Sequence, residues 1–434
     1  MTSSLVGSEM CIRDRILSSR VTTRSLLQRT VSMPSFTIHS LSADNAEAWG
    51  FMKNLQRCKA EMFCAFCFLP GELIANRAVS LYTAIKAKQI FCRKINLPAL
   101  LFPTLTMNLK GNILISTTDF GGVYLLQDVV SVSLPVNERM MIKKNHFEPY
   151  NLTGSEKRIC IVTGIHGDEL EGQYVCYELI RKLSENRHLL SGIVDIYPSM
   201  NPLGMDSIKR EMPIFELDMN MIFPGSETGA VAEHIAAAIM NDIKGADICI
   251  DIHASNIFLR EIPQVRISEE TAPKLLPYAK MLNVDFIWVH SSVTVMEATL
   301  SHSLNKEGTP TLVAEMGVGM RITKSYGDQL LDGIFNLMAE MGIWTGETKK
   351  VSHPIVSTDG NVSFIYSDTS GIFMPAIKHW AGISKGDHIG DILDPLSGAV
   401  EQEIFAPCSG IVFTLREYPV VYEGSLLARI LGGC

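Results

Sequence analysis

Three largely apolar runs of this chain each end on a polar side chain of a type that binds metals or moves protons. The runs and the residues that follow them are Ile159–Ile165 with His166, Ile248–Ile252 with His253, and Thr311–Ala314 with Glu315. Apolar runs of this length are typical of buried strands. Open α/β sheets build their sites at the carboxyl ends of strands. The pattern therefore predicts a buried sheet with one polar site along its edge.

Beyond residue 140 the chain alternates between strand-like and helix-like runs. The strand-like runs are Arg158–Ile165, Ile193–Tyr197, Ile248–Ala254, Phe286–His290 and Thr311–Met316. The helix-like runs are Leu170–Leu183, Ala230–Ile243, Glu269–Leu282, Met296–Asn305 and Ser325–Met341. This alternation predicts an α/β fold, with a largely parallel or mixed sheet flanked by helices on both faces.

The helical period gives way to short strands and glycines near Thr348–Pro354. We therefore expect a catalytic domain at 140–349 and a smaller all-β domain at 350–434. The β segment resembles the barrel-sandwich modules that carry biotin or lipoate, but Pro407–Gly410 occupies the hairpin tip where their carrier lysine would lie. We expect no covalent cofactor there, and a role in walling the cleft or in forming a homo-oligomer.

Residues 1–139 are expected to be an N-terminal extension, either a segment like a transit peptide or an artefact of the gene model. The first 40 residues are rich in arginine and serine, as in organellar transit peptides. Val6–Arg15 also looks like translated adapter sequence, which favours an extraneous segment ahead of a start near Met140 or Met141. Cys64 and Cys67 form a Cys-x-x-Cys pair without a second pair at metal-binding spacing, so we expect no metal there.

His166 and Glu169 are placed to bind a metal ion together with His253. A strand that stops at a histidine, with a glutamate three residues later at the first turn of a helix, points both side chains into one cleft. Two histidines and one carboxylate leave a fourth position open, as in catalytic zinc sites, so we expect one Zn²⁺ per chain. Glu315 is the expected general base. Taken singly, His253 is better explained as a hydrogen-bonded, partly buried histidine at a strand end, and the shared placement of the three residues at strand ends is what favours a metal site.

Composition excludes two other classes of function. The net charge of −8 argues against a general nucleic-acid binder, and no apolar run reaches the roughly 18 residues of a membrane span. The ten cysteines of a chain this long do not form a disulfide framework. Cys160, Cys176 and Cys249 lie in apolar segments, as expected of reduced, buried thiols in a cytoplasmic protein.

The order of five motifs resembles the succinylglutamate desuccinylase and aspartoacylase family, within the zinc carboxypeptidase-like group. The motifs are His166-x-x-Glu169, Asp218-Met219-Asn220, Phe223-Pro224-Gly225, Asp251-Ile252-His253 and Glu315-x-Gly317. The resemblance runs from about Met140 to the C-terminus. It implies a zinc amidohydrolase with a carboxypeptidase-like α/β domain, acting on small-molecule N-acyl amino acids or similar amides.

One position departs from the pattern of this family. The motif around Asp218 and Asn220 normally continues with an arginine that binds the substrate carboxylate, and here that place holds Met221. A thioether cannot form the paired hydrogen bonds that a guanidinium makes with a carboxylate. Another cation is therefore expected to take this role, and the candidates are Arg210, Arg260, Arg266 and Arg321.

The resemblance also implies roles for the residues around this motif. Arg210 lies about where the family has an arginine that stabilises the oxyanion, and Asn220 would hold the carboxylate or amide of the substrate. Among the four cations Arg260 is a further candidate for substrate binding. Asp218 would hydrogen-bond a ligand imidazole, or else cap the turn before Phe223.

Two alternatives to the amidohydrolase stay open. One is a zinc carboxypeptidase acting on small peptides, and the other is a zinc-binding homologue with little or no hydrolytic activity. Glu315 favours an enzyme, because a binding protein has no need of a base. Met221 favours an unusual mode of substrate recognition.

Overall fold

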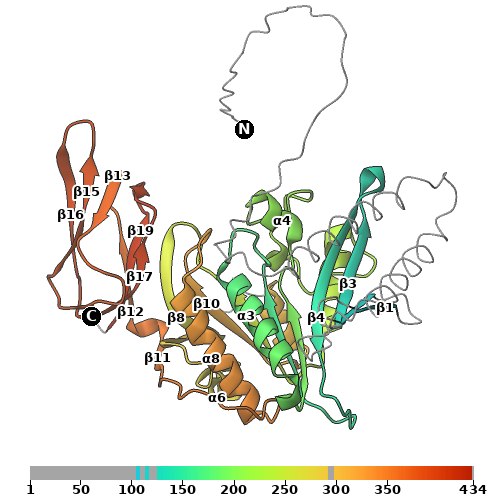
Figure 1. Ribbon diagram of the computed structural model, residues 1–434. Coiled ribbons are helices and arrows are strands. Elements are labelled where there is room, and N and C mark those ends of the chain that lie inside the picture. The colour runs from blue at the N-terminus through green and yellow to red at the C-terminus, as the bar shows by residue number, and fades with distance from the viewer. Residues whose placement is uncertain (1–103, 108–112, 117–124, 292–297, 433–434) are drawn as a thin grey trace, which may run out of the picture. The chain divides into compact units, whose positions relative to one another are not determined.

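The computed structural model describes residues 104–107, 113–116, 125–291 and 298–432 (Figure 1). The expectations for Val6–Arg15 and for Cys64 and Cys67 lie outside these residues. None of the helices in the described residues is long and apolar enough to span a membrane.

The centre of the fold is a parallel sheet in the order β6-β5-β7-β10. These strands are β5 (Arg158–Thr163), β6 (Ile193–Tyr197), β7 (Ile248–His253) and β10 (Thr311–Gly317). Because they run in one direction, their carboxyl ends meet at the same edge. His253 and Glu315 are register partners there. Every residue of β7 is buried, as expected of a strand that is covered on both faces.

Antiparallel strands extend this sheet on both sides, so that it is mixed. On one side β4 (Arg139–Phe147) pairs with β6, and β3 (Leu125–Ser133) pairs with β4. On the other side β8 (Leu259–Ser268) pairs antiparallel with β10, and β9 (Phe286–His290) runs parallel to β8. A separate pair is formed by β1 (Thr104–Met107) and β2 (Ile113–Ser116).

Helices cover both faces of the sheet. One core contains alternate residues of β5, β7 and β10, including Ile161, Ile250 and Leu312, together with the apolar sides of α3 (Glu171–Glu185) and α8 (Lys324–Glu340). The other core contains the intervening residues, such as Val162 and Cys249, with α5 (Val231–Ile243) and α7 (Leu300–Lys306). The period of two along each strand sends neighbouring residues to opposite cores.

The remaining helices are short. They are α4 (Pro202–Ser207), α6 (Ala272–Ala279), η1 (Pro135–Asn137), η2 (Arg187–Leu189), η3 (Met219–Met221) and η4 (Asp359–Asn361). Asp218 caps η3, since its side chain accepts a hydrogen bond from the Asn220 amide. The cap fixes the turn that carries Asn220.

The C-terminal segment is all β. Its strands are β11 (Ile355–Thr358), β12 (Val362–Tyr366), β13 (Gly371–Pro375), β14 (Gly382–Ile383), β15 (His388–Asp394), β16 (Ala399–Phe405), β17 (Gly410–Arg416), β18 (Val420–Val421) and β19 (Leu426–Leu431). Strands β16, β15, β13 and β18 form a separate antiparallel sheet, coloured orange to red in Figure 1. The expected fold class is confirmed: a mixed α/β sheet flanked by helices, with a small antiparallel sheet towards the C-terminus.

Strand pairing crosses both of the expected domain boundaries. At the C-terminal boundary β17 pairs antiparallel with β8, with Thr414 opposite Glu261. At the N-terminal boundary residue 140 falls inside β4, whose partner β3 precedes it. Val130 of β3 is 4% exposed and belongs to the same core as Val162. Strand β3 is therefore part of the main sheet, although it lies within residues 1–139.

This pairing predicts different stabilities for two truncated chains. A chain that starts at Thr104 keeps β3, whereas one that starts at Met140 loses it and exposes the side of β4 that β3 covers. Burial of a valine such as Val130 stabilises a fold by about 1.5–3 kcal/mol. We expect the shorter chain to melt about 4 °C or more below the longer one in thermal unfolding. Equal melting temperatures would show that β3 contributes nothing and that the fold begins at β4.

Candidate metal and catalytic site

The turn after β5 brings His166 and Glu169 to the edge of the sheet. Gly167 lies directly against the backbone of α4, where a Cβ atom would overlap Gly204. Close packing against α4 holds the turn between the strand and α3. His166 and Glu169 are both buried, at 3% and 4% exposure. Their side chains are thus taken out of water before any ligand binds.

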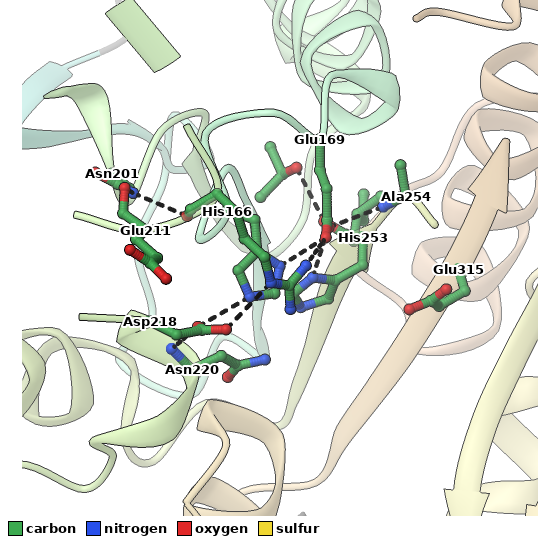
Figure 2. A network of polar contacts seen from close by, with 12 residues as sticks. His166, Glu169, Asn201, Glu211, Asp218, Asn220, His253, Ala254 and Glu315 are labelled. Carbon is green, nitrogen blue, oxygen red and sulfur yellow. Dashed lines mark hydrogen bonds and ion pairs between the residues drawn. The ribbon is translucent and has the colours of Figure 1, made fainter. Parts of the chain in front are cut away.

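His166, Glu169 and His253 form one compact group of atoms of the types that can bind a metal ion, called the metal-binding group below. Nδ1 of His166 lies 2.7 Å from Oε1 of Glu169, and Nδ1 of His253 lies 2.9 Å from Oε2 of the same carboxylate. One ligand atom from each residue can be chosen so that all lie within 4.8 Å of one another. Among the described residues no second group of three such side chains comes this close together. Figure 2 shows both imidazoles against the Glu169 carboxylate.

A second carboxylate supports each imidazole from behind. Nε2 of His166 lies 3.1 Å from Oδ1 of Asp218, and Nε2 of His253 lies 3.2 Å from Oδ1 of Asp251. A carboxylate at Nε2 favours the tautomer that carries its proton there, which leaves the Nδ1 lone pair for a cation. Both imidazoles thus direct Nδ1 towards the same place. This arrangement fits a divalent metal ion held by His166, Glu169 and His253.

The charges around the group favour a cation in the same way. Burial alone would raise the pKa of Glu169, but His253 and His166 outweigh burial and hold that pKa far below its usual range. Burial acts against a charge on His253, yet Asp251 and Glu169 raise its pKa well above the usual value. The carboxylates therefore stabilise positive charge between them, whether protons on the imidazoles or a metal ion supply it.

Glu315 stands on β10 beside this group. Figure 2 shows it on the strand next to His253, its register partner. Its side chain is 15% exposed, and Oε2 lies 3.3 Å from Nη2 of Arg266. Burial raises the pKa of Glu315, and the charge of Arg266 opposes that rise. A carboxylate with a raised pKa in a cleft is suited to accepting a proton.

The glycine of the Glu315-x-Gly317 motif has a structural cause. Gly317 has a φ of +71°, and a Cβ atom there would overlap the carboxylate of Glu171. The pairing of β10 with β8 shifts register between Glu315 and Gly317. Glycine therefore allows β10 to end close to α3, two residues after Glu315.

Arg210 and Asn220 lie in the same cleft. Nη1 of Arg210 lies 2.9 Å from Oε1 of Glu169, and its Nε donates to Asp218 at 3.2 Å. Asn220 accepts a hydrogen bond from the Leu300 amide at 3.0 Å, which anchors its side chain to the first turn of α7. Asp218 contacts the imidazole of His166 and also caps η3, so its position is compatible with both of the roles expected for it.

The structure does not bring Met221 and Arg260 to the cleft. Met221 is 57% exposed and is not among the lining residues. Arg260 points to the opposite face of β8 from its neighbour Glu261, and its guanidinium pairs with Glu417 at 3.0 Å. Their expected substrate-binding roles stay predictions that their positions do not support. Arg321 is also outside the lining, whereas Arg266 is within it.

The cleft has a volume of about 970 Å³. The metal-binding group, Glu315, Arg210 and Asn220 all line it. Sequence reasoning did not single out Arg429 of β19, which also lines the cleft, and it named Asp251 within a motif without placing it behind His253. The signal for Asp251 was its position two residues before His253, on the same face of one strand.

Comparison with known proteins gives a family match over strands β5 to β10 and the helices between and after them. The model of the succinylglutamate desuccinylase/aspartoacylase catalytic domain matches residues 155–341. A curated relative, the N-alpha-acetyl-L-2,4-diaminobutyric acid deacetylase of Halomonas elongata, is 24% identical over 275 residues, which cover 62% of this chain and 80% of the relative.

Solved structures share the fold. The product-bound ectoine utilization protein EutE (DoeB) of Ruegeria pomeroyi aligns with a TM-score of 0.60 at 20% identity, over 76% of this chain and 99% of that chain. A succinylglutamate desuccinylase/aspartoacylase of Rhodobacter sphaeroides aligns with a TM-score of 0.60 at 21% identity. The alignment covers 71% of this chain and 96% of that chain. At these identities the likeness concerns the fold.

We predict that the site binds one divalent cation per chain. Loss of a ligand should affect this binding more than loss of the carboxylate that supports a ligand. His253→Ala should abolish stoichiometric binding, because it removes a ligand. Asp251→Asn should weaken Zn²⁺ affinity by about 10–100-fold, because it removes only the support of His253. Metal analysis and calorimetric titration measure both effects. His302→Ala, a histidine that lines the same cleft outside the group, is the matched control. Undiminished metal in His253→Ala would rule out the assigned ligands.

Proposed function

We propose that this chain, as a member of the succinylglutamate desuccinylase/aspartoacylase family, removes the acyl group from N-acyl amino acids. A zinc ion is the proposed cofactor. The family makes the chain a hydrolase of amide bonds with a candidate metal site. The nature of the metal, the substrate and the roles of single residues are our proposal.

One observation carries the proposal. Two imidazoles and a carboxylate that are buried and share one centre lie in a cleft together with a separate carboxylate, Glu315. A structural metal site would be closed by four protein ligands, whereas three ligands leave a position for water or substrate. The donor set of His166, Glu169 and His253 is the type that catalytic zinc prefers. When bound there, zinc supplies a Lewis acid that polarises the scissile carbonyl and lowers the pKa of water.

The side chains around this centre have distinct tasks. Glu315 accepts a proton from the attacking water and returns it to the nitrogen of the leaving amine. Arg210 offers guanidinium donors to the oxygen that gains negative charge, and its ion pairs with Glu169 and Asp218 hold it in place. Asn220 is anchored through its side-chain oxygen to the Leu300 amide, so that its amide group is held at the cleft to bind substrate.

The substrate class follows from the family and from the cleft. The Halomonas elongata relative is named for removing an acetyl group from an amino acid. A cleft of about 970 Å³ has room for a small amide of this kind. Met221 is exposed and does not line the cleft. A cation elsewhere in the cleft would therefore bind the substrate carboxylate. Arg210 and Arg266 are the lining cations among the four candidates from the sequence.

The role of Glu315 can be separated from metal binding. Glu315→Gln keeps the shape of the side chain but cannot accept a proton, so turnover should fall by about 100-fold or more while zinc content stays the same. Glu270→Gln changes an exposed carboxylate that lines the same cleft and should keep most of the activity. Kinetics with a panel of N-acyl amino acids and small peptides, with metal analysis, makes the comparison.

The same panel tests the proposed function itself. Hydrolysis of N-acyl amino acids with loss of activity in Glu315→Gln supports the deacylase. Faster hydrolysis of dipeptides than of any N-acyl amino acid would identify a carboxypeptidase instead. Activity that survives in Glu315→Gln would move the base to another residue.

A further inference from the structure

Two arginines from distant parts of the chain meet in the cleft around one buried carboxylate. Arg266 belongs to β8 and Arg429 to β19, and Glu261 between them is 1% exposed. Nη1 of Arg429 lies 2.5 Å from Oε1 of Glu261, and Nη2 of Arg266 lies 3.3 Å from the same oxygen. All three residues line the cleft that holds the metal-binding group.

The carboxylate of Glu261 has no hydrogen-bond acceptor site left for a substrate. Its Oε1 receives both guanidiniums, while Oε2 accepts hydrogen bonds from Thr414 at 2.6 Å and Gln264 at 2.8 Å. The carboxylate therefore acts as a fixed anion that holds two like charges together. Arg266 also pairs with Glu315, so the four side chains are balanced in charge while Glu315 is ionised and carry one net positive charge once it takes up a proton.

The two guanidiniums keep unused hydrogen-bond donors. Within the described residues the ion pairs and hydrogen bonds of Arg266 run through Nη2, and those of Arg429 run through Nη1. The Nε atoms of both are buried without a hydrogen-bond partner among these residues. Nη1 of Arg266 and Nη2 of Arg429 also make no hydrogen bond or ion pair among these residues, and they are not buried as the Nε atoms are. These outer nitrogens are therefore the donors that an acceptor in the cleft can reach.

Packing holds both arginines in place before a ligand arrives. The guanidinium carbon of each lies 5.6 Å from the ring centroid of Trp288, within the range of a cation–π contact. Their side chains are 21% and 16% exposed, so neither is free to swing into solvent. A preorganised pair of planar forks is the arrangement that binds a carboxylate with directional hydrogen bonds.

We propose that Arg266 and Arg429 form a carboxylate-binding site for the substrate, in place of the arginine that the family pattern has at position 221. The assignment to a substrate rests on the proposed function, whereas the affinity for carboxylates does not. The carboxylate belongs either to the acyl chain, as in an N-succinyl group, or to the amino acid. Arg266 also contacts Glu315, so Arg429 is the member that can be changed without touching the base.

The test compares ligands with one and two carboxylates. In calorimetric titrations of the full chain loaded with zinc, succinate should bind about tenfold or more tightly than butyrate, which lacks the second carboxylate. Arg429→Met should remove this difference. Arg416→Met is the matched control, because Arg416 of β17 bonds carbonyl oxygens and does not line the cleft. A preference for succinate that Arg429→Met leaves intact would overturn the proposal.

A second variant separates a loss of succinate binding from a loss of folding. Arg429→Lys keeps the charge over Trp288 but loses the planar fork, so it should lower succinate affinity by several-fold while it melts close to the parent protein. Parent-like affinity in a folded Arg429→Lys would show that the fork is not used, and would equally overturn the proposal.

Substrates identify which carboxylate is bound. An N-succinyl amino acid amide carries its charge on the acyl side, and an N-acetyl amino acid carries it on the amine side. Arg429→Met should lower kcat/KM about tenfold for one of these classes and leave an uncharged N-acetyl amino acid amide unchanged. Equal loss for the charged and uncharged substrates would overturn the site.

Failure of this inference can be told from failure of the proposed function. If the parent protein cleaves none of these amides but binds succinate through Arg429, the carboxylate site stands and the deacylase does not. If it cleaves them while Arg429→Met and Arg416→Met bind succinate equally, the deacylase stands and the site does not.

Discussion

The carboxylate of Glu169 is the constraint on which the rest of the site depends. Its two oxygens are shared by His166, His253, Arg210 and the backbone amide of Ala254. A buried carboxylate is costly unless opposite charges and donors surround it. The fold meets this need with groups from three separate segments: the turn after β5, the segment after α4, and the end of β7 with the residue that follows it. Each segment is thereby held at the same edge of the sheet, where a metal ion can replace the protons on the imidazoles.

Opposite charges alternate from this carboxylate across the cleft. Asp218 and Asp251 lie behind the imidazoles, and on the far side Glu315, Arg266, Glu261 and Arg429 follow one another in direct contact. Removal of one member of such a series leaves its neighbour buried without a partner, which costs more than the contact itself contributes. Substitutions that keep shape, such as Glu to Gln, are therefore more informative here than alanine.

Much of the fold was predictable from the sequence, although β3 and β4 were not expected and the failure to predict β8 has a physical cause. Strands β6 and β9 have the expected bounds, and β5, β7 and β10 differ by one or two residues at their carboxyl ends, because apolar runs that are buried on both faces give a strong signal. Strand β8 was missed. One side of this strand lines the cleft, so its sequence contains the polar residues Arg260, Glu261, Gln264 and Arg266 as well as Pro263. These residues interrupt the apolar pattern by which a strand is predicted. The expected helix Glu269–Leu282 is shortened to α6, which has a proline inside it.

The site was predictable where sequence position also fixes the direction of a side chain. His166, Glu169 and His253 meet because strand ends and a helix start determine where they point. The spacing of Arg260 in the sequence does not determine where its side chain points. Side chains alternate between the two faces of β8, so Arg260 points away from the cleft and Glu261 points into it. Arg429 gave no signal, because it reaches the cleft through the pairing of β17 with β8 and of β19 with β17, which joins residues more than 150 positions apart. The C-terminal strands are therefore more than a cover. They supply the second guanidinium beside Glu261, and the cleft is complete only when these strands have joined the sheet.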